Sequence, residues 1–197
     1  MNLRMDRISV VMQIRFSLMT KLNIGCGWRD FGDGWVHIDG GDYPHLDHDD
    51  IYLKDYSDDS VDLIYASHMI EYFDRKEIDV LLEQWHRVLK PNGTLRIAVP
   101  DFTSMAELYF MCEIDLVDIL GPLYGKMQMG DEVIYHKTVY DFWDLSEVLT
   151  DSGFKDVRKY DWRETEHSEF DDHSQAYIPH MDKENGTLIS LNVEATK

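Results

Sequence analysis

Short apolar runs of strand length constrain the fold of this chain more than any other feature of its sequence. Four such runs cover residues 21–25, 35–39, 61–66 and 94–99, and glycine or proline stops three of them. Nearly continuous apolar runs of four to eight residues are typical of parallel strands that are covered on both faces. Helical patterns alternate with these runs, which predicts an α/β fold with a doubly wound sheet and helices on both faces.

Three helices are expected between and after these strands. The first begins at Asp74, where Asp74 and Glu77 have the spacing of a capping box, and Lys90-Pro-Asn-Gly93 ends it. The second is expected over residues 103–120, ended by Gly121-Pro122, and the third over residues 140–151. The helices therefore follow the third and fourth apolar runs.

The last part of the chain predicts two strands, near residues 154–162 and 188–195, with no helix between them. Strands joined in this way form a terminal antiparallel pair. The 197 residues contain no internal repeat and no Pro- or Ser-rich linker, so we expect one domain over residues 21–197. Residues 1–20 are expected to form an N-terminal appendage, because charged residues interrupt their apolar positions and make a poor signal peptide.

The formal net charge of −19 at pH 7 argues against some partners. Such a surface repels nucleic acid and anionic membranes, so neither is expected to bind, whereas a neutral or cationic small molecule is compatible. Solubility alone is an equally good explanation of the charge. Cys26 and Cys112 lack a metal-binding or redox spacing, which favours a reducing compartment, and we expect a cytoplasmic protein.

The first strand ends in a glycine turn, Asn23-Ile-Gly25-Cys-Gly27, where open α/β sheets bind ligands. Asp39 ends the second strand, and an acidic residue there can accept hydrogen bonds from a ribose. A tight structural turn is the alternative. The third glycine of a dinucleotide fingerprint is absent and little room remains for a helix before Trp35, which disfavours NAD and its pyrophosphate.

Four ordered segments together resemble the class I S-adenosylmethionine (SAM)-dependent methyltransferase family. They are residues 22–27 (LNIGCG), 34–39 (GWVHID), 58–71 (DDSVDLIYASHMIE) and 88–93 (VLKPNG). The resemblance covers about residues 21–101 and implies a Rossmann-like, mostly parallel, seven-stranded sheet. It also implies SAM as cofactor and S-adenosylhomocysteine (SAH) as product. Residues 21–101 would form the cofactor-binding half and residues 102–197 the substrate-facing half.

The resemblance assigns cofactor contacts to Asn23, Gly25, Cys26, Gly27, Asp39, Asp50, Ile51, Ser67 and His68. The turn would face the methionine part of SAM, Asp39 the ribose, Asp50 and Ile51 the adenine, and Ser67 and His68 the methionine end. Asp50 in a solvated acidic loop and His68 as a structural histidine are the alternatives. Tyr72 stands where the family often carries histidine, and Lys54-Asp-Tyr56 replaces a usual Leu-Pro-Phe.

Catalysis by methyl transfer requires mainly that the acceptor is aligned with the methyl group, and a hydroxyl acceptor benefits from a general base. His136 and Asp101 are the predicted catalytic residues. The alternatives are a buried structural histidine at position 136 and a helix cap at position 101. Tyr135, His173 and His180 are predicted to contact the substrate, the last two from a loop that could cover the pocket.

The acceptor is predicted to be a sugar hydroxyl of a glycan or nucleotide sugar. Residues 120–126, His136 and Gly153-Phe154 resemble methyltransferases that accompany glycan synthesis, and the aromatic C-terminal half could stack on a sugar. An N-methyltransferase of a small amine or protein and a non-catalytic cofactor-binding module remain alternatives. A divalent metal at residues 171–180 is less favoured than a polar loop without metal.

Overall fold

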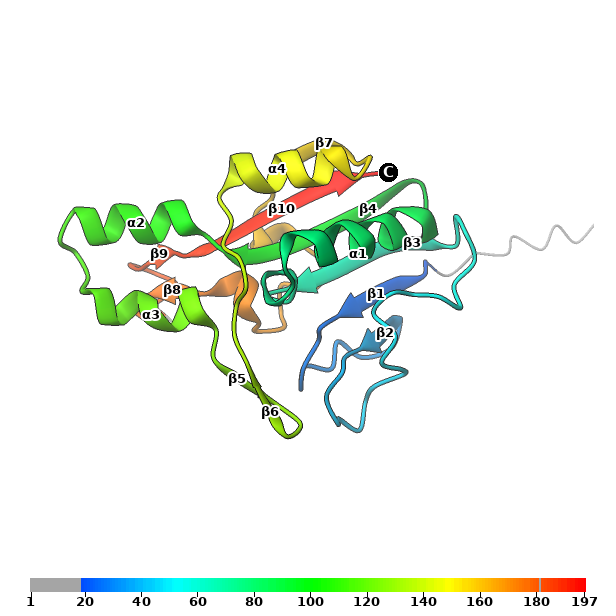
Figure 1. Cartoon of the computed structure of the whole chain (residues 1–197), viewed down its shortest axis with the longest axis horizontal. Coiled ribbons are helices and arrows are strands. Elements are labelled where there is room, and N and C mark those ends of the chain that lie inside the picture. The colour runs from blue at the N-terminus through cyan, green and yellow to red at the C-terminus, as the bar shows by residue number, and fades with distance from the viewer. Residues whose placement is uncertain (1–18, 181) are drawn as a thin grey trace, which may run out of the picture.

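The centre of the molecule is a mostly parallel sheet, seen in a computed structural model that describes residues 19–180 and 182–197. Within those residues the main sheet has six strands in the order β2-β1-β3-β4-β10-β7 (Figure 1). The parallel strands are β1 (Lys21–Ile24), β2 (Trp35–Ile38), β3 (Val61–Ser67) and β4 (Leu89–Pro100). β10 (Ser190–Thr196) runs antiparallel to both β4 and β7 (Lys155–Lys159), which confirms the terminal antiparallel pair.

The expected seventh strand of the main sheet is absent from the described residues. Residues 39–60 follow β2 as a series of turns, with one bridge between Ile38 and His48. Acidic side chains in this segment bond to nearby backbone, as Asp50 does to the N–H groups of Tyr52 and Lys54. Such local bonds compete with the hydrogen bonds of a strand, and they account for the missing element.

One face of the sheet is covered by α1 (Arg75–Val88) and α4 (Phe142–Asp151) (Figure 1). The predicted capping box is confirmed, because Asp74 accepts from the N–H of Glu77 and Glu77 accepts from the N–H of Asp74. One stripe of α1 is buried against the strands: Ile78, Leu81, Leu82, Trp85 and Val88. These contacts form the main hydrophobic core of the described residues.

The opposite face carries no α-helix of the described residues, so the prediction of helices on both faces is wrong for this part of the chain. Phe31, Trp35 and Tyr65 form an aromatic cluster on this face, and Phe170 and His167 pack against it. The covering segment contains two short 3₁₀ turns, η2 (Trp162–Glu164) and η3 (His173–Gln175). Only residues 25–34 join β1 to β2, and four of their glycines have positive φ angles, which prevents a helix there.

The predicted helix over residues 103–120 is instead two helices, α2 (Phe102–Phe110) and α3 (Leu116–Tyr124). The chain breaks at Cys112, which has φ +59°, and Asp115 with Asp118 then forms a second capping box. Gly121-Pro122 lies inside α3, and the helix ends at Gly125 in a left-handed conformation. The capping spacing of Asp115 and Asp118 was the sequence signal for this break.

Two small antiparallel pairs complete the fold. One is the hairpin of β5 (Met127–Met129) and β6 (Glu132–Ile134), and the other joins β8 (Tyr177–Ile178) to β9 (Thr187–Leu188). Across the part of the chain that the structure describes, no helix is both long and apolar enough to cross a bilayer. Of the expected N-terminal appendage, residues 1–18 lie outside the described residues.

Candidate active site

The glycine turn after β1 is hydrogen-bonded directly to the acidic residue after β2. The N–H of Gly27 donates to Oδ2 of Asp39 over 2.8 Å, and the N–H of Gly41 donates to Oδ1 over 2.7 Å. Asp39 is 8% exposed, and Gly25 and Gly27 have φ of +72° and +58°. The structure therefore places the turn and the carboxylate side by side, as a nucleoside site requires.

The space beside this turn differs between its two glycines. A β-carbon on Gly27 would meet no atom of the described residues within 4 Å, whereas one on Gly25 would lie 2.5 Å from Cγ of Met69. Met69 is buried and follows β3, so it joins the glycine turn to the segment around His68. The open side at Gly27 fits a ligand held by the turn and by Asp39, and these residues fit SAM.

The other two predicted residues of the turn are buried. Asn23 lies in β1, and Sγ of Cys26 is 3.7 Å from Nε2 of His45. Burial, reinforced by the charge of Asp39, raises the pKa of the Cys26 thiol to about 12. Cys26 is thus a neutral thiol at pH 7 and supports the turn without nucleophilic character.

Asp50 and Ile51 lie in the turns after β2. Asp50 accepts N–H bonds from its own turn, and the carbonyl of Ile51 accepts from Nε1 of Trp85 over 2.8 Å. The Ile51 side chain packs against the main core and is half-buried. A contact of these two residues with adenine stays a prediction.

His68 follows β3 with φ +50°, and its hydrogen bonds define its tautomer. Its Nε2 lies 3.1 Å from Oγ of Ser190, while Ser190 donates that hydroxyl to Oδ1 of Asn192. The Ser190 oxygen must therefore accept from Nε2–H, which leaves a lone pair on Nδ1. Burial lowers the pKa of His68 well below its usual range, so the ring is neutral at pH 7. The neighbouring Ser67, at the end of β3, is half-buried.

Glu71 is a candidate site residue that sequence reasoning did not single out. It lies in the 3₁₀ turn η1 (Ile70–Tyr72) with 0% of its surface exposed. Its Oε1 is 3.8 Å from Nδ1 of His68 and 3.6 Å from Nε2 of His136, and neither carboxylate oxygen has a hydrogen-bond partner among residues 19–180 and 182–197. Burial raises the pKa of Glu71 to about 8, so the carboxyl group carries a proton at neutral pH.

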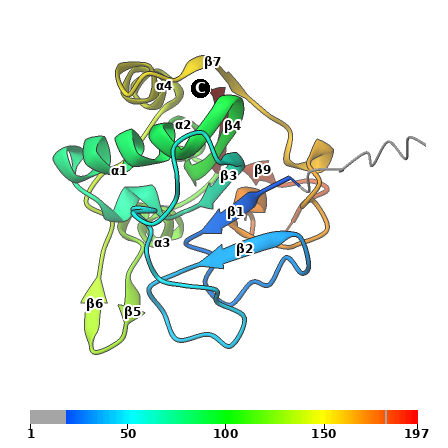
Figure 2. The ribbon, with the colours of Figure 1, turned by 90° about the vertical axis from the view of Figure 1, so that its right-hand side faces the viewer.

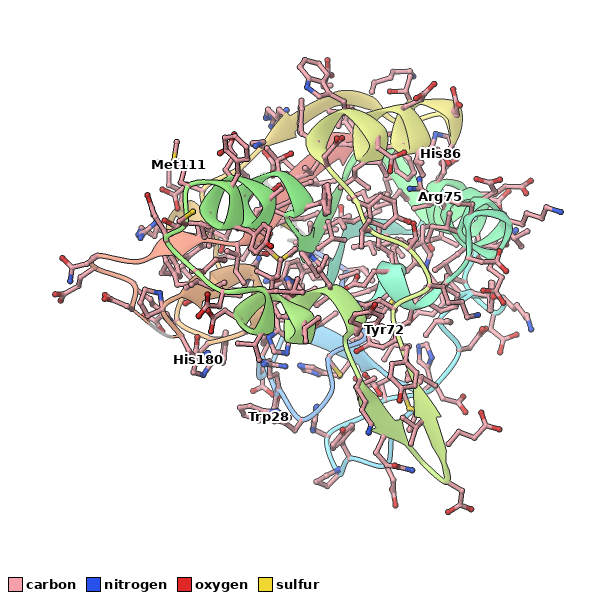
Figure 3. The ribbon with its side chains drawn as sticks, turned by 60° about the vertical axis from the view of Figure 1, so that its left-hand side comes forward. Trp28, Tyr72, Arg75, His86, Met111 and His180 are labelled. Atoms are coloured by element: carbon pink, nitrogen blue, oxygen red, sulfur yellow. The ribbon has the colours of Figure 1, made fainter. Side chains whose placement is uncertain are left out.

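His136 packs on the end of α3. A β-carbon on Gly125 would overlap the imidazole of His136, and the Tyr72 ring lies 4.6 Å from that imidazole. The Tyr72 hydroxyl donates to the carbonyl of Gly125 over 2.7 Å. The His136 side chain is 5% exposed, and burial lowers its pKa. Figure 3 shows Tyr72 where the chain leaves α3 for β5.

Asp101 does not share this cluster. It caps α2, accepting from the N–H of Thr103 and from the N–H and hydroxyl of Ser104. No hydrogen bond or ion pair of the described residues joins Asp101 to His136. The structure thus brings His136 together with Glu71 and His68, and it gives Asp101 the capping role that was its alternative.

The predicted substrate residues are spread around the site. The His173 ring lies 5.2 Å from the His68 ring and is exposed, and Tyr135 is 46% exposed beside His136. His180 is exposed at the outer edge of the molecule (Figure 3). Tyr140, Trp162 and Tyr177, which were expected to stack on a sugar, are buried; Tyr135 and Trp143 remain exposed.

Residues 171–180, where a divalent metal was the less favoured expectation, have a structural role. Asp172 is buried and accepts from the hydroxyls of Tyr65 and Ser174. In the described ranges, no three His, Cys, Asp or Glu side chains are grouped so that they could hold a metal ion. Asp172 therefore ties the covering segment to the sheet.

The β5–β6 hairpin stands over the cofactor edge of the sheet. A β-carbon on Gly40, the residue after Asp39, would lie 3.9 Å from Sδ of Met129 in β5. At the base of the hairpin, the N–H groups of Lys137 and Thr138 donate to the carbonyl of Glu71. Figures 1 and 2 both show the hairpin projecting beside β1 and β2. The hairpin thus connects the Glu71 cluster to the Asp39 turn.

Comparison with known proteins gives a family-model match over part of the chain and a shared fold. Residues 39–97 match the family model described as a methyltransferase domain. No curated protein sequence matches the chain. The fold is similar to that of a SAM-dependent methyltransferase from Methanosarcina mazei, with 17% identity, TM-score 0.57, and coverage of 90% of this chain and 92% of that one.

Two further solved structures give the same result. A SAM-dependent methyltransferase from Archaeoglobus fulgidus is 18% identical with TM-score 0.56, covering 92% of this chain and 87% of that one. One from Mesorhizobium loti is 16% identical with TM-score 0.52, covering 91% of each chain. The matched segment is that of a methyltransferase domain, and the fold is similar to that of SAM-dependent methyltransferases.

Proposed function

We propose that the protein transfers the methyl group of SAM to a hydroxyl of a sugar, in a glycan or a nucleotide sugar, with His136 as general base. The observation that carries the proposal is the packing of Met69 on Gly25. Through it, the segment that holds Glu71 and contacts His136 lies against the glycine turn. A cofactor site and a neutral imidazole beside it are the two requirements of hydroxyl methylation.

Different residues would bind SAM and take up the acceptor proton. The backbone of Gly25–Gly27 and the carboxylate of Asp39 would hold SAM, whose sulfonium supplies an activated methyl group. His136 would accept the hydroxyl proton as the oxygen–methyl bond forms and the sulfur–methyl bond breaks. Because the His136 side chain is only 5% exposed, an acceptor would reach its imidazole only after the residues packed around it move.

The sugar acceptor is inferred from the resemblance of residues 120–126 to glycan methyltransferases. Gly125 of this segment lies under the His136 ring, and its carbonyl accepts from the Tyr72 hydroxyl. Gly153, by contrast, packs against His86 at the far end of α1 and has a structural role. Tyr135 is the exposed aromatic next to the base.

The test is a SAM-consumption assay against sugars, nucleotide sugars, phenols and amines. We expect transfer to a sugar hydroxyl, loss of at least 100-fold of that rate in His136→Ala, and unchanged SAH binding in the same variant. Full activity of His136→Ala would exclude it as the base.

Methylation of an amine is the second candidate, because the net charge of −19 attracts cationic acceptors. Transfer to amines but not to hydroxyls in the same panel would replace the first proposal. SAM binding without transfer to any acceptor would favour a non-catalytic cofactor-binding module.

A further inference from the structure

We propose that Glu71 is a positioning residue that makes His136 an effective base, by placing a carboxylate against its Nε2 while the acceptor proton is taken up at Nδ1. This inference rests on the proposed function, because it assigns the residue that orients the general base and pairs with it. It also makes a prediction about the free protein that needs no acceptor.

The geometry around Glu71 is that of a buried acid between two imidazoles. The same oxygen, Oε1, faces Nδ1 of His68 and Nε2 of His136 at 3.8 and 3.6 Å. A buried carboxyl group without a hydrogen bond costs stability, and Glu71 is retained at 0% exposure without one. A purely structural position would be filled better by an apolar side chain.

The groups that surround Glu71 come from three parts of the fold. His68 follows β3, with the His173 ring tilted against it; Tyr72 shares η1; and His136 and Tyr140 precede α4. Burial raises the pKa of Tyr72 and of Tyr140, the charge of Glu71 adds to both shifts, and among these neighbours Glu71 is the group whose charge changes near neutral pH. The charge of the cluster near pH 8 is therefore set by Glu71.

The tautomer of His68 locates the proton of the resting state. Because Nε2–H of His68 is directed to Ser190, its Nδ1 can only accept, so a proton shared between His68 and Glu71 belongs to the Glu71 carboxyl group. Resting Glu71 is then neutral. Above its pKa the carboxylate would accept from Nε2–H of His136 and stabilise the imidazolium that forms. Nδ1 of His136 is buried and has no hydrogen-bond partner in the described residues, so it would take the acceptor proton once the acceptor displaces the residues that cover it.

In the proposed methyl transfer, the proton of the acceptor hydroxyl passes first to His136 and then to water. His136 would take the proton of the acceptor hydroxyl at Nδ1 as the oxygen–methyl bond forms, and bound SAM would supply the methyl group and leave as neutral SAH. The imidazolium is paired with the Glu71 carboxylate until the product leaves and the proton passes to water. Only the ionised form of Glu71 supports this sequence, so the rate should rise with pH.

The experiment compares wild type, Glu71→Gln and Glu83→Gln between pH 6 and 9.5. Glu83 is an exposed residue of α1 and serves as the matched charge-neutral control. We expect kcat of wild type and Glu83→Gln to rise with pH and level off above about 8. Glu71→Gln should lower kcat at least 100-fold and abolish the rise of kcat with pH, while KM for SAM stays unchanged. A Glu71→Gln variant with wild-type kcat and pH profile overturns the proposal.

A second measurement separates this inference from the proposed function. NMR titration of the free protein, with labelled glutamate carboxyl carbons and histidine ring nitrogens, should show Glu71 titrating near pH 8 and His136 shifting in step. In Glu71→Gln the shift of the His136 ring signals near pH 8 should vanish. Binding of SAH by the same variant shows that the protein is folded. Titration of Glu71 near 4.5, or a His136 signal without that shift, overturns the inference even if no acceptor has been found.

Discussion

Gly27 donates its backbone N–H to Oδ2 of Asp39 over 2.8 Å, so the turn after β1 and the end of β2 share one carboxylate. Asp39 accepts a second N–H from Gly41 and is nearly buried. A carboxylate that already organises two turns is preorganised for further hydrogen bonds, because its position costs no additional entropy on ligand binding. The cofactor half of the site is therefore built before the ligand arrives.

Replacement of Asp39 by alanine should weaken SAM binding by about 10- to 100-fold, since hydrogen bonds to a charged group contribute about 1.5–3 kcal/mol. Isothermal titration calorimetry with SAM and SAH measures the effect. Asp42→Ala, which removes an exposed acidic residue close by, is the control and should bind normally. Equal affinity of both variants and wild type would show that the ligand does not use this carboxylate.

Alanine at the two glycines of the turn should have opposite main effects. Gly25→Ala combines a left-handed φ of +72° with a contact at 2.5 Å from Cγ of Met69, so we expect a loss of about 2–4 kcal/mol in the free energy of unfolding. Gly27→Ala has open space and should lose only about 1–2 kcal/mol, but its methyl group enters the ligand side and should weaken SAM binding. Urea denaturation and calorimetry distinguish the two, and a Gly25→Ala protein as stable as Gly27→Ala would refute the contact.

Much of the fold was predictable because it depends on local sequence. The four parallel strands and the start of α1 followed from apolar runs and from the spacing of Asp74 and Glu77, which act over a few residues. The break between α2 and α3 had a local signal at Asp115, but the prediction of one helix over residues 103–120 missed it. Asp39 could be placed because a strand end is visible in the sequence.

The rest depends on contacts between distant segments, which one sequence does not reveal. Glu71 and His136 lie on separate elements and meet only because η1 and the end of α3 pack together. The face without α-helices could not be foreseen either, since its cover comes from residues 160–176 near the end of the chain. A buried acid in an apolar turn, Glu71 between Ile70 and Tyr72, was the one local sign of this cluster.

Alanine at Gly125 should abolish catalysis without loss of the fold. Its β-carbon would occupy the place of the His136 ring, so the imidazole must leave Glu71, and we expect at least a 100-fold loss of kcat. Gly121→Ala in the same helix meets no atom within 4 Å of the described residues and should be neutral or stabilising by about 0.5–1 kcal/mol. If Gly125→Ala keeps wild-type activity, His136 does not act from the observed position.

His167 offers a test of the aromatic face. Its ring is 1% exposed, stacks 5.6 Å from Phe31 and lies 4.1 Å from Tyr65, and neither ring nitrogen has a hydrogen-bond partner in the described part of the chain. Burial lowers its pKa from 6.5 to about 4. The folded protein then binds fewer protons than the unfolded chain between these values, so this group's contribution to stability is complete above pH 6.5 and is lost as pH falls through about 4.

His167→Phe should therefore raise the free energy of unfolding by about 1–3 kcal/mol at pH 7, because a ring of similar shape replaces unsatisfied polar atoms. It should also reduce the dependence of stability on pH between 6.5 and 4, by up to about 1.4 kcal/mol per pH unit for one group. Urea denaturation at pH 5 and pH 7 measures both effects, with the exposed His180→Gln as control. The buried, unpartnered state of His167 would be wrong if the phenylalanine variant were less stable at pH 7 and equally sensitive to acid.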